Sequence, residues 1–393
     1  MPSLVVNVSA AMRYSPPRSS NPISTKTLAA APGTVKLHAM IIDRIDPIAL
    51  RIPAAGGSTL CLTLSRVVTR DGVEGYGECL SLRPPMQRAL YATIRDAIAP
   101  HYLGKSVDDR EALNLAARKR FASFGRAGTV LNALASVDIA LWDIAGKVAN
   151  KSVSALLGGA KRSQIPVMAS LDKYDDAKRT RTRVEEALAT GVAAVKVHEH
   201  RLEVAEESRR VIPAAMPYVV DCNNAHTLAD IKRDEKRWAA MNLLFFEDPL
   251  WPPEELLSMP AMPGITIGMG ADFGSAEQMA IYSKTPAIGV LQPDVCMLGG
   301  LSEAKRALAM LATAKKTAAP HTPFVGPAAL ASLHMLAVAE GEGYFATVEA
   351  DDSMDPYGFG HTRWKASLDV PTGPGLGFDP DPGFLNRYDY AKE

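Results

Sequence analysis

Eight short apolar runs recur through residues 165–349 of this 393-residue chain, and their spacing constrains the fold more than any other feature. Two of the segments between them, 177–190 (AKRTRTRVEEALAT) and 301–316 (LSEAKRALAMLATAKK), carry a pattern typical of helices. Strands that alternate with helices indicate a parallel sheet. Eight such units predict an α/β fold in the form of a barrel whose last helix is missing. The runs begin near residues 165, 193, 218, 243, 265, 287, 318 and 344, at intervals of 22–31 residues.

Three further segments flank the predicted barrel, which we place at residues 161–365. Residues 1–35 are basic and rich in serine and contain no acidic residue, which predicts a flexible extension, with a transit peptide as the alternative. Residues 36–160 begin with β-branched runs around an Asp-Gly turn signal and continue with helical patterns, which predicts an α+β domain. The Pro- and Gly-rich residues 366–393 are expected to return to that domain.

The clearest helical pattern lies in this α+β domain. Apolar residues follow one another at steps of four and three, which predicts one long helix with a single apolar face. These residues are Val130, Leu134, Val137, Leu141, Ile144 and Val148.

The overall composition excludes several classes of function. The chain is 47% apolar and 22% charged, with zero net charge, so nothing predicts a nucleic-acid partner or an anionic membrane surface. No apolar run approaches the ~20 residues of a membrane span. The cysteines form no CxxC pair, which predicts neither a disulfide framework nor a zinc cluster and favours a reducing, cytoplasmic location. They are Cys61, Cys79, Cys222 and Cys296.

Three acidic residues each close one of the apolar runs. Asp221 ends YVVD, Glu247 ends LLFFE and Asp272 ends ITIGMGAD, so they recur about one strand and one helix apart. Because the carboxyl ends of barrel strands meet at one rim, we expect the three carboxylates side by side. Hard oxygen ligands suit Mg²⁺ better than zinc. The sequence therefore predicts a Mg²⁺ cofactor held by these residues.

Other ionisable residues end the remaining strands. Lys196 and His198 alternate along the second strand and therefore point the same way. His321 is a candidate general base, and Asp294 on the neighbouring strand is placed to fix its tautomer. Glu349, if burial keeps it protonated, is a candidate hydrogen-bond donor to a developing oxyanion. A metal and a base around one carbon predict abstraction of the proton α to a carboxylate.

Taken together, these motifs resemble the enolase superfamily, in its mandelate racemase-like subgroup. The resemblance covers about residues 36–385. It implies a modified (β/α)₇β TIM barrel with an α+β N-terminal capping domain, a Mg²⁺ ion, and removal of the α proton from a small-molecule carboxylate. It rests on 136–159 (SVDIALWDIAGKVANKSVSALLGG), Lys196-x-His198, Asp221-x-Asn223, Glu247-Asp248-Pro249, Asp272, 292–306 (QPDVCMLGGLSEAKR) and His321.

Two positions depart from the pattern of that subgroup. The second strand usually ends in Lys-x-Lys, whereas this chain has His198 at the second position, so the role of His198 is open. The third metal ligand is often a Glu after Gly. Here the sequence Met-Gly-Ala-Asp gives that role to Asp272, as in muconate-lactonising relatives.

All the candidate reactions share the loss of an α proton and differ in the fate of the resulting anion. Expulsion of a β-hydroxyl would make a sugar-acid dehydratase, which forms a 2-keto-3-deoxy acid. We expect this function, because the imidazoles of His198 and His321 suit groups that both accept and donate protons. Return of the proton to the other face would make a racemase or epimerase, and ring closure or opening a lactone cycloisomerase. Intact Lys196, Asp294 and His321 argue against a non-catalytic sugar-acid-binding homologue.

Specificity is expected to come largely from the capping domain. Its loops 51–59 and 81–87 are predicted to close over the barrel mouth, and the Gly-rich first loop suits a mobile lid. We predict substrate contacts from Arg51, Arg83 and Asn223, with surface arginines and a turn residue as the alternatives. The expected partner is a small sugar acid, and we expect a homo-oligomer that binds neither nucleic acid nor membrane.

Overall fold

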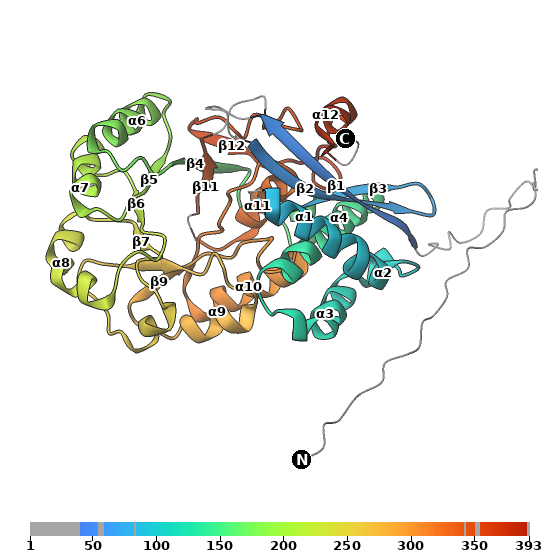
Figure 1. Ribbon diagram of the computed structural model, residues 1–393, viewed down its shortest axis with the longest axis horizontal. Coiled ribbons are helices and arrows are strands. Elements are labelled where there is room, and N and C mark those ends of the chain that lie inside the picture. Colours follow the sequence, from blue (N-terminus) through green and yellow to red (C-terminus); the bar gives the residue numbers. More distant parts are fainter. Residues whose placement is uncertain (1–39, 54–58, 82–83, 342, 350–353, 391–393) are drawn as a thin grey trace, which may run out of the picture. The chain divides into compact units, whose positions relative to one another are not determined.

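The computed structural model describes residues 40–53, 59–81, 84–341, 343–349 and 354–390 (Figure 1). The predicted extension at 1–35 lies outside the described residues. So do the middle of the first predicted capping loop and two residues of the second, Leu82 and Arg83.

The capping domain is built on an antiparallel sheet of three strands. Strands β1 (Ile42–Pro53), β2 (Thr59–Thr69) and β3 (Glu74–Cys79) are paired in the order β1-β2-β3. The predicted Asp-Gly turn joins β2 to β3, and Gly72 there adopts a φ of 79°, a left-handed conformation that glycine adopts without steric cost. The turn signal in the sequence is thus confirmed.

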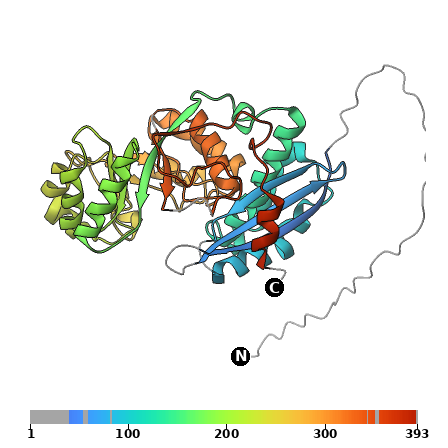
Figure 2. The same cartoon turned by 90° about the horizontal axis from the view of Figure 1, so that it is seen from above.

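The two faces of this sheet have different partners. Along β2, the side chains alternate between a cluster shared with the capping helices and a cluster shared with helix α12 (Pro382–Tyr388). Figure 2 shows α12 across one face of the sheet and the other helices behind it. Those are α1 (Pro84–Thr93), α2 (Ala99–Tyr102), α3 (Arg110–Arg120), α4 (Thr129–Ala149) and α5 (Val153–Leu156), with a π-helical turn at Ile94–Ile98 and 3₁₀ turns at Val107–Asp109 and Ala122–Phe124.

Helix α4 is buried on nearly all sides, so the expectation of a single apolar face is wrong. Its length and apolar composition would suit a membrane span, contrary to the sequence expectation of no such run, but 83% of its apolar stretch is buried inside this protein. One side lies so close to β3 that a Cβ on Gly77 would stand 1.9 Å from the carbonyl oxygen of Ser136. Other residues of α4 contact barrel helices α10 and α11. The helix is apolar because it separates the capping sheet from the barrel.

The eight predicted strands of the barrel are all present. They are hydrogen-bonded in the order β10-β9-β8-β7-β6-β5-β4-β11, and all these pairs are parallel. Between β10 and β11, the Thr322 hydroxyl bridges to the backbone N–H and carbonyl of Ala346. The strands are β4 (Gln164–Leu171), β5 (Ala194–His198), β6 (Tyr218–Asp221), β7 (Phe245–Glu247), β8 (Ile267–Met269), β9 (Ile288–Leu291), β10 (Thr317–Ala318) and β11 (Phe345–Val348).

Helices follow most of these strands and cover the outside of the sheet (Figure 1). After β11 the chain adds β12 (Ser367–Asp369), which pairs antiparallel with β4, before it reaches α12 beside the capping sheet. The helices are α6 (Ala177–Ala189), α7 (Leu202–Val211), α8 (Leu228–Ala240), α9 (Ala276–Tyr282), α10 (Leu301–Ala314) and α11 (Pro327–Val338), with a 3₁₀ segment at Pro253–Ser258 in place of a helix after β7.

Side-chain alternation within the strands places the polar residues above an apolar floor. A separate apolar cluster holds one residue from each of six strands: Met168, Ala194, Val219, Phe245, Val290 and Ala346. Moving two residues along a strand returns to the same face of the sheet. Ala194 therefore shares its face with Lys196 and His198, Val219 with Asp221, and Phe245 with Glu247.

Candidate active site

Strand register brings the first two predicted metal ligands together. His198 is paired with Asp221, and Asp221 is paired with Glu247, so these three residues lie side by side at the carboxyl ends of β5, β6 and β7. The next partner in this row is Gly268, not an acid. Asp272 lies four residues further on, in an exposed turn beyond the end of β8.

The Lys196 ammonium group lies between the two carboxylates. It donates to Glu247 Oε1 at 2.8 Å and to Asp221 Oδ2 at 3.3 Å, and all three residues are buried. Burial alone would lower the pKa of Lys196, but the charges of Glu247 and Asp221 outweigh it and raise that pKa above its usual value. The same contacts hold the pKa of Asp221 well below its ordinary range, although burial opposes the shift. Lys196 therefore remains charged here.

His198 binds the same carboxylate from the other side. Its Nδ1 lies 2.5 Å from the carbonyl oxygen of Leu171, which accepts only from an N–H, and its Nε2 lies 3.2 Å from Asp221 Oδ2. Burial would lower the pKa of His198, but the hydrogen bond to Asp221 raises it. The substitution of His for the expected second Lys thus keeps a potential cation beside the acids.

A third carboxylate completes an acidic group that differs from the predicted one. One oxygen from each of Asp221, Glu247 and Asp248 lies within 4.8 Å of the others. Asp248 joins this group because its φ of 38° turns the chain at the end of β7. The sequence identifies Asp248 only within the Glu247-Asp248-Pro249 motif, and alternation along an ideal strand would point it away from Glu247. Asp272 is outside the group, and its role as a ligand stays a prediction.

The acidic group fits a divalent cation. Glu247 Oε2 is buried and has no hydrogen-bond donor among the described residues, and an unpaired buried carboxylate oxygen is costly unless a cation binds it. The donors are all oxygen, which suits Mg²⁺. Burial and the charges of Glu247, Asp221 and Asp272 together raise the pKa of Asp248 well above its usual value, as expected where several carboxylates crowd one place.

The predicted pair of Asp294 and His321 forms as expected from their places on neighbouring strands. His321 Nδ1 lies 2.7 Å from Asp294 Oδ2. The other oxygen of Asp294 accepts the backbone N–H groups of Cys296 and Met297, at 2.7 and 2.9 Å, and the residue is fully buried. A carboxylate held in this way requires a proton on Nδ1, so Nε2 is left as the proton acceptor.

Lys196 and His321 share one cavity inside the barrel. The same small cavity is lined by Gln292, whose side-chain oxygen is buried without a hydrogen bond among the described residues. Gln292 lies two residues before Asp294, and side chains two residues apart in an extended chain point the same way. This spacing is the sequence signal that could have identified Gln292 as a site residue. His321, the predicted base, therefore lies on the same cavity as the ammonium group that binds the two acids.

Glu349 has partners that the sequence did not predict. It accepts hydrogen bonds from the Tyr174 hydroxyl and from Arg183 Nε, the latter at 3.3 Å. These two donors occupy one oxygen of Glu349, and its predicted role toward an oxyanion stays a prediction. Tyr174 and Arg183 come from the segment between β4 and β5, and no motif connects them to β11 in the sequence.

The predicted substrate-binding residues have other contacts in this structure. Arg51 donates to Gln87 at 3.2 Å and stacks over the ring of Tyr390, 3.2 Å from its centroid, so it joins the sheet to the C-terminal segment. Asn223 adopts a φ of 47° in a turn, and its N–H binds Asp221 Oδ1 at 2.9 Å. Arg83 lies outside the described residues. Binding of substrate by these three residues stays a prediction.

Comparison with known families agrees with this arrangement. A family model described as "Mandelate racemase / muconate lactonizing enzyme, N-terminal domain" matches residues 38–158, and one described as "Enolase C-terminal domain-like" matches residues 179–384. The chain belongs to the enolase superfamily. The resemblance inferred from the sequence is confirmed, as is the barrel with its capping domain. Members of this superfamily bind a divalent metal, typically Mg²⁺.

Relatives of this enolase-superfamily chain include dehydratases and cycloisomerases. Arabinonate dehydratase from Saccharolobus solfataricus is 26% identical over 358 residues, which cover 86% of this chain and 94% of that protein. D-galactarolactone cycloisomerase from Agrobacterium fabrum is 27% identical over 341 residues, covering 81% and 88%. The crystal structure of 3,6-anhydro-D-galactonate cycloisomerase from Zobellia galactanivorans has a TM-score of 0.76 at 25% identity, covering 88% and 99%. The family thus acts on carboxylic acids, and both dehydratases and cycloisomerases are similar to this chain.

Proposed function

We propose that this protein is a Mg²⁺-dependent sugar-acid dehydratase that converts a sugar acid into a 2-keto-3-deoxy acid. The observation that carries the proposal is the Asp294–His321 pair on the cavity that also exposes Lys196 beside the acidic group. A base, a cation and a cluster of carboxylates around one small space are the parts needed to remove a proton next to a carboxylate.

The base is His321. Asp294 keeps the proton on Nδ1, and Nε2 accepts the α proton of the substrate. The charge of Asp294 stabilises the imidazolium that results, because the two groups lie 2.7 Å apart in a buried site. This step breaks a C–H bond and leaves negative charge on the substrate carboxylate.

Negative charge on the substrate needs positive charge nearby. Asp221, Glu247 and either Asp272 or Asp248 would hold Mg²⁺, which when bound stabilises that charge as a Lewis acid. Lys196 is held beside the same acids and adds a second positive charge from the protein itself.

Elimination completes the reaction. The imidazolium of His321 returns its proton to the β-hydroxyl as the carbon–oxygen bond breaks, so water leaves and an enol remains. The enol then gains a proton at carbon and loses its hydroxyl proton, which gives the 2-keto acid. One imidazole serves as base and then as acid, and the overall change is the loss of one water.

The test combines proton exchange with product analysis. The protein is incubated with mono- and diacid sugars, Mg²⁺ and deuterated water, and 2-keto product is scored with semicarbazide. We expect product from one sugar acid, and we expect His321→Asn to abolish both product and α-proton exchange while Mg²⁺ still binds. His101→Asn, in α2 of the capping domain, is the matched control and should retain both. No keto acid from any sugar acid would refute the dehydratase proposal.

A lactone cycloisomerase is the second candidate. Relatives of this class are as similar to the chain as the dehydratases are, at 27% and 25% identity. The product decides between them, because a cycloisomerase product has the mass of its substrate, whereas a dehydratase product is lighter by one water. Mass spectrometry of the product from each sugar acid and its lactone would separate the two functions. A homo-oligomeric state and a cytoplasmic location stay predictions.

A further inference from the structure

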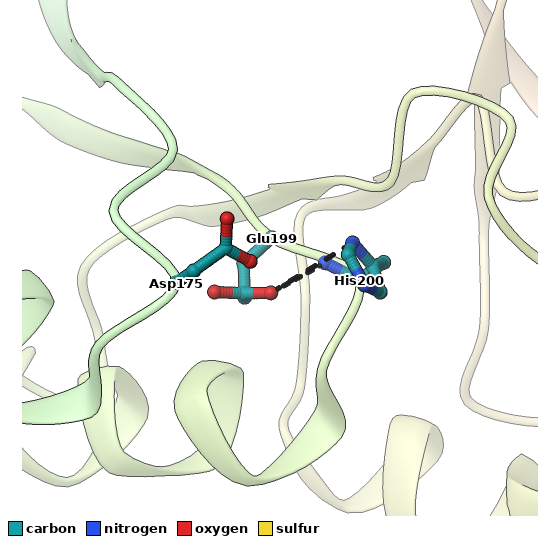
Figure 3. A group of neighbouring side chains, drawn as sticks. All are labelled: Asp175, Glu199 and His200. Atoms are coloured by element: carbon teal, nitrogen blue, oxygen red, sulfur yellow. Dashed lines mark hydrogen bonds and ion pairs between the residues drawn. The ribbon is translucent and has the colours of Figure 1, made fainter.

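We propose that Asp175, Glu199 and His200 form a second divalent-cation site, separate from the acidic group at the ends of β6 and β7. One potential ligand atom of each residue lies within 4.8 Å of the others. Figure 3 shows the carboxylates of Asp175 and Glu199 facing each other, with the imidazole of His200 beside them. Asp175 lies in the loop after β4, and Glu199 and His200 directly follow β5.

Glu199 gives the strongest reason to expect a ligand here. Its side chain is buried, with a relative exposure of 1%. Oε1 accepts the backbone N–H groups of His200 and Arg201, at 3.0 and 2.9 Å. Oε2 is buried and has no hydrogen-bond donor within the described residues. A buried carboxylate oxygen without a partner is costly, and a bound cation removes that cost. Glu247 shows the same feature in the predicted Mg²⁺ site.

Asp175 presents its carboxylate from the neighbouring loop. It adopts a φ of 54°, which holds this part of the loop in a turned conformation. Lys173 Nζ lies 3.2 Å from Asp175 Oδ1, so the lysine pairs with one oxygen and leaves the other. On the other side, Arg201 Nε lies 3.8 Å from Glu199 Oε1 and does not reach Oε2. These two cations offset part of the local charge, but neither provides the missing partner.

The third donor decides the kind of ion. His200 Nδ1 lies 3.9 Å from Glu199 Oε1, beyond hydrogen-bond distance, and the side chain is 37% exposed. Two carboxylates and one imidazole suit a first-row transition ion such as Zn²⁺, with water at the open position. Mg²⁺ prefers oxygen donors alone. The two acidic groups of the barrel rim are therefore expected to differ in the metal that they select.

An ion at this place would join two loops next to the candidate active site. The ends of β4 and β5, where these loops begin, are already joined by the contact of His198 Nδ1 with the carbonyl oxygen of Leu171 at 2.5 Å. A cation that binds Asp175 to Glu199 and His200 would add a second connection above that contact. Its expected effect is to stabilise the folded chain and these loops, and no chemical step requires it.

Zn²⁺ is the probe that tests the site. The experiment uses the Asp221→Asn variant, which weakens the predicted Mg²⁺ site, and excess Mg²⁺, which competes with Zn²⁺ for that site. Bound Zn²⁺ is then measured by equilibrium dialysis. We expect one Zn²⁺ per chain and a higher midpoint of thermal unfolding with Zn²⁺. His200→Ala should lower the Zn²⁺ affinity by at least about 10-fold, the lower end of what loss of an outer-shell partner costs, and should remove the thermal shift.

Two further variants make the result decisive. Glu199→Gln and Asp175→Asn, added to Asp221→Asn, should each weaken Zn²⁺ binding as His200→Ala does. Glu203→Gln, an exposed acid one turn away on α7, should not. Circular dichroism confirms that each variant is folded, and His200→Ala provides the test if the buried Glu199→Gln does not fold. Absence of bound Zn²⁺, or binding that survives both His200→Ala and Asp175→Asn, would overturn the proposal.

Discussion

The two oxygens of Asp294 have different functions in the structure. One is held by the N–H groups of Cys296 and Met297, and the other faces His321 Nδ1. A carboxylate can only accept at both oxygens. The orientation of Asp294 by the backbone thus determines the tautomer of His321, and with it which ring nitrogen can act as a base.

Asp294→Asn should therefore remove the base without removing the fold. The amide oxygen can keep the two backbone contacts, but the amide NH₂ would then face Nδ1 and require the proton on Nε2. We expect the rate of α-proton exchange to fall by about 10²–10⁴, as general-base catalysis is worth about this much. Mg²⁺ affinity should stay within a few-fold of wild type. An exchange rate that is unchanged in deuterated water would show that Asp294 does not set the tautomer.

The identity of the third metal ligand is a second question at this scale. We expect Asp272→Asn to lower Mg²⁺ affinity by at least about 10-fold, a loss at the low end of metal-site substitutions. Asp221 ends β6 and Glu247 ends β7, so Asp272 after β8 would bind the ion from a third direction. Asp248 directly follows Glu247 and would bind it from the same strand end. Titration calorimetry of Asp272→Asn and Asp248→Asn side by side decides the point. A loss confined to Asp248→Asn would move the third ligand to the end of β7.

At the scale of elements, two of the family motifs contribute to the contact between the two domains. Asp138 of α4 accepts from the N–H and hydroxyl of Ser302 in α10, at 2.9 and 2.7 Å, and Trp142 Nε1 donates to the same hydroxyl. Burial raises the pKa of Asp138 to about 7, although these hydrogen bonds oppose the shift. Both helices come from the segments that carried the resemblance. The helical parts of those segments are thus explained by packing between the domains, whereas Gln292 and Asp294 at the start of the second segment belong to the candidate site.

This contact predicts that Gly300 tolerates no side chain. A Cβ there would stand 2.3 Å from Asp138 Oδ2, and the residue has a φ of 116° at the start of α10. Gly72 also has a positive φ, but a Cβ there meets no atom within 4 Å. We expect Gly300→Ala to lower the free energy of unfolding by about 2 kcal/mol more than Gly72→Ala, the cost of overpacking. Urea denaturation of both variants measures the difference, and equal losses would contradict the predicted clash.

Local patterns predicted the strands and their ends, because period and turn signals act over a few residues. They placed Lys196, Asp221, Glu247, Asp294 and His321 at one rim. They missed contacts that depend on distant segments, such as Tyr174 and Arg183 on Glu349, or Tyr390 over Arg51. They did not assign Asp248 to the acidic group, which it joins through a turned backbone at the end of β7 that breaks the alternation of an ideal strand.

At the scale of the whole molecule, Glu78 connects the capping sheet to the barrel. It is the second-last residue of β3 and is almost fully buried, and its Oε2 accepts the N–H of Ala328 at the start of α11, at 2.9 Å. The backbone carbonyl oxygen of Glu78 accepts a hydrogen bond from Cys296 Sγ, at 3.3 Å. Cys296 lies two residues after Asp294. Burial raises the pKa of Glu78 to about 8, and the negative charge of Asp294 contributes in the same direction. This carboxyl is neutral in the folded protein at neutral pH.

A raised pKa gives the stability a definite pH dependence. The unfolded chain ionises Glu78 near its ordinary pKa of 4.5, whereas the folded chain does so only near 8. Between these values, each rise in pH favours the unfolded state, by up to about 1.4 kcal/mol per unit. Glu78→Gln keeps an acceptor for the N–H of Ala328 but cannot ionise. The stability of wild type relative to Glu78→Gln should therefore be greatest and level below about pH 4.5, fall between about pH 4.5 and 8, and stay level above that. Denaturant titrations of both proteins across this range measure it, and a difference that does not change with pH would show that Glu78 is already ionised in the folded protein.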